Sequence, residues 1–584
     1  MSASGLQSFA FHRHEQSDVV DAIRPIVGFD RPLPDGRPAI AGLDPETAAR
    51  RYLTEAFASP ALPTFNTPEI DGKASEFRTL GTENVPLTGT QVVKFRQVYR
   101  RIPIYGSLIT VELDENNELL ALNSTLGTPP ADLNVMATLS PAQAMDVVRQ
   151  RAGQDAESIN ALPRLVFYFH EPEQHWHLAY LVENVTRRQP DTPKGAMRRA
   201  PELMDYIVDA HSGNLIAELP RTQSIHPQGM QPTQELLFRR RRMEPEFEEA
   251  ADGLGVRRKF AAKKMGEVWK LIDSELNVHT YDFSFHDLER DERLLPGAYV
   301  GRPPEPWDPA AVSAHANAVA VALFLRKVLK REGLDNRGGP VISSINCCYG
   351  GGGGKEWHNA AWIGTQMVYG QRAAQGGGIR SYAVALDVVA HEILHGLTDH
   401  TARLEYAGMS GALNESYSDI FGVIVSNLNN PDVGTWNWEM GEELETSGIP
   451  IRDLSQPEKY NQPAHMKDYE FLAVGPLTDW GGVHTNSGIH NKAAYHLLTS
   501  KDAQGNFLFD PREVAAIFYL ALTQHLSRTS KFIDSRRGVE LAARTFLRND
   551  PRQKEKLAAI GAAFDAVGIT SNLGANFEPN KLSS

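Results

Sequence analysis

The stretch from His391 to His395, which reads His-Glu-Ile-Leu-His, constrains this chain more than any other segment. Residues four apart in an α-helix lie on the same face, so both imidazoles would point to one side. Two histidines at this spacing, with a glutamate directly after the first, are typical of a helix that holds a catalytic zinc ion. Glu415, in the segment Asn-Glu-Ser-Tyr-Ser-Asp at 414–419, can complete a ligand set of two histidines and one glutamate. Water or substrate would take the fourth position.

These two segments together resemble the thermolysin-like zinc metallopeptidases, also called M4 or neutral proteases. The family's marks HExxH and NExxSD both stand here at the family's spacing. Residues 479–492 are similar to the family segment whose histidine faces the zinc, and residues 359–370 are similar to its edge strand along the substrate cleft. The likeness is strongest over residues 340–500, weaker over 75–220 and absent before that.

The resemblance implies a role for each residue of the site. A zinc ion held by His391, His395 and Glu415 would lower the pKa of its water toward about 7 and polarise the scissile carbonyl. Glu392, about 100° around the helix from His391, would take the proton of the water and pass it to the leaving amine. The other implied roles are ring acceptors for His391 and His395 (Asp419 and Asn414), oxyanion donors (Tyr406 and His484), a partner that orients His484 (Asp479), and residues that bind the substrate main chain (Arg452, Asn359 and Ala360).

Four residues resemble ligands of the family's double-calcium site: Asp387, Asn437, Glu439 and Glu442. Ser426 stands where the family has a glutamate that bridges both ions. Two hard cations need several shared carboxylates, so we expect at most one calcium ion here. The same acids also fit an ordinary charged surface.

The resemblance implies an α+β fold, a zincin metallopeptidase with a β-rich N-terminal lobe and a helical C-terminal lobe, preceded by α+β propeptide domains. The sequence agrees, because residues 309–332 predict a long helix and the periodicity after Asp387 is mainly helical. The expected parts are an N-terminal pro-region (1–74), a domain similar to fungalysin and thermolysin propeptides (75–130), a PepSY-like domain (138–220), a processing linker (221–255), the N-terminal lobe with the HExxH helix (256–400) and the C-terminal lobe (401–575).

Patterns within the first 220 residues support a folded prosegment. Apolar residues alternate over 109–113 and resume at Leu119 after a turn, which predicts a β-hairpin, and Ser140 begins a capped helix. Residues 221–255 are rich in Pro, Gln and charge, which suits an exposed processing linker or a merely solvated connector. We expect the prosegment to inhibit the enzyme intramolecularly and to be removed by autoprocessing, with the mature chain starting between 225 and 257. An α+β domain without an inhibitory role is the alternative.

Composition limits the partners. The net charge of −13 argues against a nucleic acid or an anionic membrane surface, so protein or peptide substrates and the prosegment are the expected partners. The apolar stretch 310–325 is broken by Ser313, His315 and Asn317, which predicts a buried helix rather than a membrane span. The two cysteines, Cys347 and Cys348, are adjacent and provide no disulfide framework. We interpret them as small buried residues, with a redox or metal role as the alternative.

The family resemblance predicts a secreted enzyme, but residues 1–10 show no basic region followed by an apolar one, as a Sec signal would. An intracellular enzyme, an unconventional export route and a start site placed too late all stay open.

The predicted function is a zinc-dependent endopeptidase made as a precursor. Apolar Val388 and Ile451 beside Arg452 predict cleavage on the amino side of bulky hydrophobic residues. The alternatives are another zincin-type hydrolase or aminopeptidase, and a catalytically silent binding or inhibitory protein.

Overall fold

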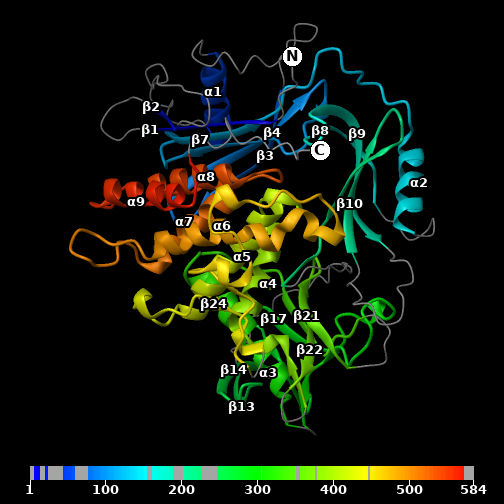
Figure 1. Ribbon diagram of the computed structural model, residues 1–584, viewed down its shortest axis with the longest axis vertical. Coiled ribbons are helices and arrows are strands. Elements are labelled where there is room, and N and C mark those ends of the chain that lie inside the picture. The colour runs from blue at the N-terminus through cyan, green and yellow to red at the C-terminus, as the bar shows by residue number, and fades with distance from the viewer. Residues whose placement is uncertain are drawn as a thin grey trace.

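The computed structural model of the protein describes residues 6–13, 20–23, 44–58, 76–153, 161–187, 202–225, 246–303, 306–349, 355–374, 378–444 and 447–570. Figure 1 shows an N-terminal part with two sheets, a central group of helices, and further strands at the opposite end. The elements of the central group all come from the C-terminal half of the chain, so the catalytic motifs lie between the two strand-rich regions.

The first sheet has the strand order β2-β1-β7-β6-β4-β3, with β5 paired to β4. Its strands are β1 (Gln7–Arg13), β2 (Val20–Ile23), β3 (Glu76–Val85), β4 (Thr90–Tyr99), β5 (Ile102–Pro103), β6 (Leu108–Leu113) and β7 (Leu119–Leu126). The predicted hairpin is confirmed, because β6 and β7 pair antiparallel. Helix α1 (Pro45–Ala58) buries Ala48 and Leu53 in the core of this sheet. Strands β1 and β2 and helix α1 therefore belong to the same domain as β3–β7.

The second sheet has the order β11-β10-β9-β8 and is covered by one helix. Its elements are α2 (Pro141–Ala152), β8 (Arg164–His170), β9 (His175–Arg187), β10 (Glu202–Asp209) and β11 (Leu215–Pro220). Ser140 caps α2, since its hydroxyl accepts from Gln143 N–H and the Gln143 side chain accepts from Ser140 N–H. The predicted helix start is therefore confirmed.

The N-terminal lobe of the catalytic part is built on a sheet with the order β12-β21-β22-β20-β17-β16. Its strands, with β18 and β23 at the sides, are β12 (Gln223–Ser224), β16 (Ile272–Asp273), β17 (Val278–Asp282), β18 (Ala298–Tyr299), β20 (Val341–Ile345), β21 (Trp357–Trp362), β22 (Met367–Ala373) and β23 (Ile379–Ser381). A smaller sheet contains β13 (Glu246–Ala251), β14 (Arg257–Met265), β15 (Val268–Lys270) and β19 (Gly301–Arg302). Both cysteines are buried in this lobe, and burial raises the pKa of both thiols, which agrees with a packing role.

Helices form the rest of the catalytic part. They are α3 (Pro309–Lys327), α4 (Leu386–Asp399), α5 (Gly408–Asn427), α6 (Asp479–Leu498), α7 (Pro511–Leu520), α8 (Phe532–Phe546) and α9 (Gln553–Ala566), with the short strands β24 (Glu439–Met440) and β25 (Arg452–Asp453) between them. Helix α3 is long and apolar enough to cross a membrane by length and composition, but Ser313, His315 and Asn317 on it are fully buried. It is the buried core helix that the sequence predicted.

The expectation of an exposed linker over 221–255 is wrong for residues 221–225, which are all buried. Residues 246–251 are largely exposed, as expected, but they form strand β13 against β14. The polar composition misled the prediction, because pairing with a neighbouring strand satisfies the backbone groups of these residues whatever their side chains are. Residues 226–245 lie outside the described residues.

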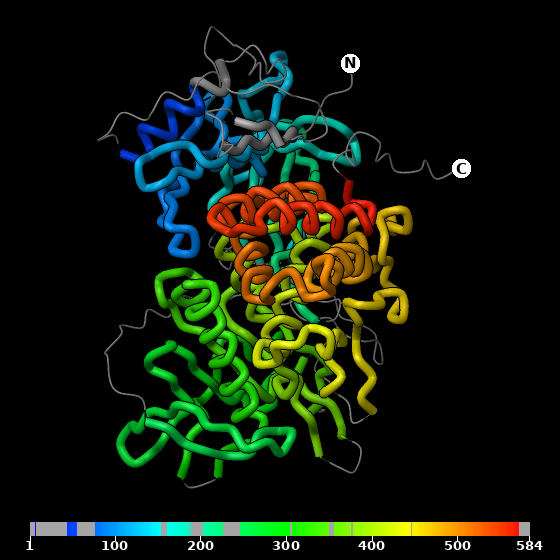
Figure 2. The backbone as a smooth tube through the Cα atoms, turned by 90° about the vertical axis from the view of Figure 1, so that its left-hand side faces the viewer, coloured from blue at the N-terminus to red at the C-terminus, as the bar shows by residue number. Residues whose placement is uncertain are grey.

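The prosegment packs on the helices of the catalytic part (Figure 2). Glu112 and Asn123 of the first sheet accept hydrogen bonds from Thr545 (2.9 Å) and Arg537 (3.1 Å) of α8. At the other end, Arg221 forms an ion pair of 2.8 Å with Asp399 at the end of α4. The chain therefore leaves the prosegment beside the helix that carries HExxH.

Candidate active site

Two packed helices bring the expected metal ligands together. Helix α4 carries His391 and His395 one turn apart, and α5 carries Glu415. The two Nε2 atoms lie 3.0 Å apart, and each lies 3.4 Å from an oxygen of Glu415. All three side chains are fully buried.

The opposite ring nitrogens of the two histidines are held by α5. His391 Nδ1 lies 2.8 Å from Asp419 Oδ1, and His395 Nδ1 lies 2.9 Å from Asn414 Oδ1. Since both Nδ1 atoms face acceptors, each Nε2 carries a lone pair that points at the other and at Glu415. Burial and the neighbouring His391 also keep the pKa of His395 well below its usual value, so the ring stays neutral. Lone pairs and a carboxylate converging without a proton form a cation site, and nitrogen and oxygen donors of this kind fit Zn²⁺.

Glu392 lies on the same helix, turned toward the N-terminal lobe. Its Oε2 accepts the N–H of Trp362 on β21 at 3.1 Å. Burial, followed by the charge of Glu415, raises the pKa of Glu392 well above its usual value, and the backbone amides of Ile225 and Trp362 oppose that shift. The carboxylate therefore lies between the helix that carries the metal ligands and strand β21.

Residues 223–225 add a strand to the edge of the N-terminal lobe. Strand β12 pairs antiparallel with β21, with Gln223 opposite Trp362 and Ser224 opposite Ala361. The next residue, Ile225, donates its N–H to the carbonyl of Ala360 at 3.4 Å. The strand that the sequence analysis compared with the family's edge strand, β21, is therefore paired with β12 on its outer side.

His484 contacts the prosegment strand from the helical lobe. Its Nε2 lies 2.7 Å from the carbonyl oxygen of Ser224, and its Nδ1 lies 2.7 Å from Asp479 Oδ1. Burial disfavours the charged ring, but the carboxylates of Asp479 and Glu415 outweigh it and raise the pKa of His484 to about 9. The start of α6 makes this approach possible, because Gly481 and Gly482 adopt positive φ angles of 91° and 73° that glycine tolerates.

Tyr406 and Arg452 complete the surroundings of Glu415. The Tyr406 hydroxyl donates to Glu415 and lies 3.3 Å from His484 Nε2. Arg452 donates from Nη1 to Glu415 Oε2 (3.4 Å) and from Nη2 to the carbonyl of Ile225 (3.1 Å). The arginine thus binds the main chain directly after strand β12.

Asn359 is the remaining cleft residue that the sequence predicted. It is buried on β21, where its Oδ1 accepts the N–H of Ala360. The sequence analysis missed Trp362 as a partner of Glu392 and missed Ser224 and Ile225 altogether. An isolated isoleucine within a polar segment was the available signal for the last two.

The four expected calcium ligands also lie near one another. Asp387 Oδ2 accepts from Gly441 N–H (2.7 Å), and the Asn437 side chain donates to Glu442 (2.6 Å). Burial and the charge of Asp387 raise the pKa of Glu442 to about 7, and Glu439 contributes in the same direction. The oxygen atoms of these acids do not form one of the compact metal-binding groups found among the described residues.

Comparisons with known proteins agree with this geometry. The "Thermolysin metallopeptidase, catalytic domain" family matches residues 249–399, and the "Thermolysin metallopeptidase, alpha-helical domain" family matches residues 402–569. The chain belongs to the thermolysin metallopeptidase family. It is a metalloendopeptidase with a propeptide, since the "Fungalysin/Thermolysin Propeptide Motif" matches residues 75–126.

Relatives extend over most of the chain. It is 30% identical to neutral protease B of Bacillus subtilis (strain 168), over 86% of each chain. It is also 30% identical to thermolysin of Alicyclobacillus acidocaldarius, over 90% of each chain. Among solved structures, the precursor of protealysin, a metalloproteinase from Serratia proteamaculans, is 29% identical over 53% of this chain and 90% of the other, with a TM-score of 0.42. The thermolysin-like fold with a sheet-rich N-terminal and a helical C-terminal lobe is confirmed, and neither alternative function is favoured.

Proposed function

We propose that the protein is an autoprocessed endopeptidase precursor whose prosegment lies in its own cleft as a substrate, with Ser224–Ile225 as the first bond cleaved. The observation that carries this proposal is the polar environment of that bond. The carbonyl of Ser224 faces His484 (2.7 Å), the carbonyl of Ile225 accepts from Arg452 (3.1 Å), and Glu392 accepts the N–H of Trp362 (3.1 Å) on the strand to which this segment is paired. A proton donor for the oxyanion and a carboxyl group that can carry the proton of the water to the amine thus lie near one peptide bond.

The proposed roles follow from these contacts. His391, His395 and Glu415 would hold the zinc ion, which when bound polarises a carbonyl and lowers the pKa of water. Glu392 takes a proton from the attacking water and delivers it to the nitrogen of Ile225, which becomes the leaving amine. His484 keeps its proton at neutral pH, because its pKa is raised to about 9, and donates to the oxygen of Ser224 as negative charge develops there.

Two neighbours assist these groups in the proposal. The Tyr406 hydroxyl is 3.3 Å from His484 Nε2, so it is close enough to join His484 as an oxyanion donor. Asp479 orients the His484 ring through Nδ1, while Asp419 and Asn414 fix the rings of the metal ligands. None of these side chains needs a large movement to act.

The proposed substrate preference rests on Ile225. This side chain is 1% exposed and belongs to the same buried apolar cluster as Val388, against which Ile451 also packs. A pocket that buries isoleucine directly after the bond supports cleavage on the amino side of bulky hydrophobic residues. Cleavage at Ser224–Ile225 would start the mature chain at residue 225, at the early end of the expected range.

The proposed calcium content is at most one ion, bound near Asp387 and Glu442. Burial raises the pKa of both Asp387 and Glu442, so their ionised forms are disfavoured. One bound hard cation would stabilise the two carboxylates. Ser426 donates its hydroxyl to the Val423 carbonyl within α5 and supplies no bridging charge for a second ion.

An extracellular location is proposed on family membership, and fractionation of the producing cells tests it.

The test of the function is the variant Glu392→Gln in the full-length chain. We expect it to bind zinc, to stay intact and to cleave an internally quenched peptide at least ~10²-fold more slowly than the wild type, which is the usual scale for a general base. The matched control is Glu458→Gln, which changes an exposed glutamate of the same lobe. The wild type and the control should both release a fragment that begins at Ile225. Near-normal cleavage by a zinc-loaded Glu392→Gln protein would contradict the mechanism, and full peptidase activity of an uncleaved precursor would contradict the inhibitory role.

A further inference from the structure

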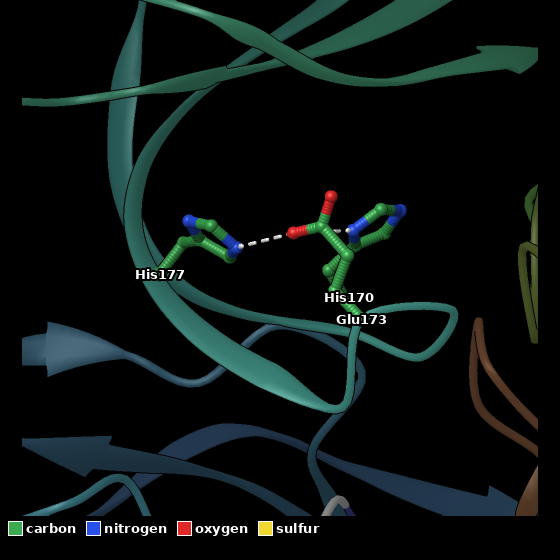
Figure 3. A group of neighbouring side chains, drawn as sticks. All are labelled: His170, Glu173 and His177. Carbon is green, nitrogen blue, oxygen red and sulfur yellow. Dashed lines mark ion pairs between the residues drawn. The ribbon is translucent and has the colours of Figure 1, made fainter. Parts of the chain in front are cut away.

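The hairpin of β8 and β9 in the prosegment carries a second compact group of metal-binding side chains. His170 ends β8, Glu173 lies in the turn and His177 lies in β9 (Figure 3). Their ligand atoms all lie within 4.8 Å of one another. Within the described residues, this group and the set on α4 and α5 are the two of this kind.

The hairpin register brings the three side chains together. His170 pairs with His175, and Tyr168 pairs with His177, so His170 and His177 are diagonal neighbours on one face, with ring centroids 6.3 Å apart. The turn is closed by a hydrogen bond from Gln174 N–H to the carbonyl of Glu171 (3.1 Å). This turn carries the Glu173 carboxylate over the same face, with Oε2 at 3.3 Å from His170 Nδ1 and 3.7 Å from His177 Nε2.

His177 is oriented from behind by Asp209 at the end of β10. His177 Nδ1 lies 2.9 Å from Asp209 Oδ2. Asp209 Oδ1 also accepts the N–H groups of Ser212 (2.7 Å) and His211 (3.0 Å), which fixes this carboxylate in place. A carboxylate can only accept here, so the Nδ1 of His177 carries the ring proton and the lone pair on Nε2 points toward Glu173.

Two buried ring nitrogens and a carboxylate therefore converge on one face of the hairpin. His170 Nδ1 and His177 Nε2 are both inaccessible to solvent and lack hydrogen-bond geometry to any partner among the described residues. A converging set of acceptors is unfavourable unless a cation lies between them. The separations of 3.3 and 3.7 Å are close to the roughly 3.4 Å expected between ligands of a tetrahedral zinc ion with bonds of about 2.1 Å.

We propose that His170, Glu173 and His177 form a second site for a divalent transition metal ion of the zinc class, with Asp209 as the outer partner that fixes the His177 ring. Two imidazole nitrogens and one carboxylate suit Zn²⁺ better than Ca²⁺ or Mg²⁺, which prefer oxygen ligands. Glu171 in the same turn forms an ion pair with Lys531, directly before α8. A bound ion therefore ties together the turn that rests on the catalytic part.

The site is tested by counting zinc in the full-length Glu392→Gln protein, whose intact mass shows that the prosegment is present. After equilibration with Zn²⁺ and removal of free metal, elemental analysis should give two ions per chain. Glu173→Gln and His177→Ala, each added to this background, should reduce the count to one. Because Glu173 is exposed, Glu173→Gln reports on the site even if His177→Ala does not fold. The matched control is His175→Ala, which removes an exposed histidine whose ring centroid is 4.8 Å from that of His177 but which is outside the ligand set, and it should retain two ions.

A proton on either ring could also pair with Glu173, and the counts separate that case from metal binding. One ion per chain in the parent protein would overturn the proposal. Two ions in the Glu173→Gln protein would overturn it as well, and loss of the second ion in His175→Ala would overturn the ligand assignment. As a second readout, Zn²⁺ beyond one equivalent should raise the unfolding temperature of the parent protein and leave that of Glu173→Gln unchanged, because only an ion bound by the folded state stabilises it.

Discussion

Replacement of Ile225 by alanine tests whether the prosegment is cleaved because it lies in the cleft as a substrate. The side chain is 1% exposed, and the change removes three carbon atoms from the apolar pocket. At ~0.8 kcal/mol for each buried carbon, the loss is about 2.4 kcal/mol, which corresponds to a decrease in rate of up to about 50-fold. The decrease arises because the segment occupies the site less often; the backbone contacts to Ala360 and Arg452 do not involve this side chain, so the cut should stay at the same bond.

The assay follows cleavage of the 224–225 bond itself, by intact mass and N-terminal sequencing of fragments over time after refolding. Ile225→Leu is the matched control and should be processed at a rate close to that of the wild type, because it keeps the volume and apolar character of the side chain. Ile225→Asp should abolish this cut, since it places a carboxylate near Glu392 and Glu415. A rate for Ile225→Ala within twofold of the wild type, or a dominant N-terminus elsewhere in the wild type, would refute the reasoning.

Three further outcomes are expected. His484→Ala should lower kcat by ~10²-fold or more with little change in KM, as loss of an oxyanion donor does, and a pure KM effect would exclude that role. Burial raises the pKa of Glu405, beside Tyr105 of the prosegment, to about 7, so the folded precursor favours its protonated form. Its contribution to stability is present below pH about 4.5 and is lost as the pH rises through about 7. Glu405→Gln in the intact Glu392→Gln precursor should therefore make the unfolding temperature less dependent on pH over this range. An unchanged pH profile would contradict this. Removal of calcium should lower the unfolding temperature and release at most one ion per chain. Two calcium ions bound near Asp387 and Glu442 would overturn that expectation.

The sequence by itself predicted the features that depend on the residue periodicity of one helix or one strand. Helical periodicity places His391 and His395 on one face, so the ligand pair followed from the five-residue motif. The alternation over 109–113 predicted the hairpin of β6 and β7 for the same reason, since the period of a strand is a local property. Polar composition, in contrast, predicted an exposed linker, whereas Ser224 and Ile225 are buried.

The tertiary structure decided which segments meet. Strand pairing uses backbone groups that every residue except proline carries, so the sequence pattern does not predict that β12 pairs with the edge of β21. His170 and His177 come together with Asp209 only because β8, β9 and β10 adopt a particular register, and a shift of one residue would turn each ligand to the other face. Motifs within one helix are thus readable from the sequence, while the occupied cleft and the second metal site depend on long-range pairing that only the folded chain fixes.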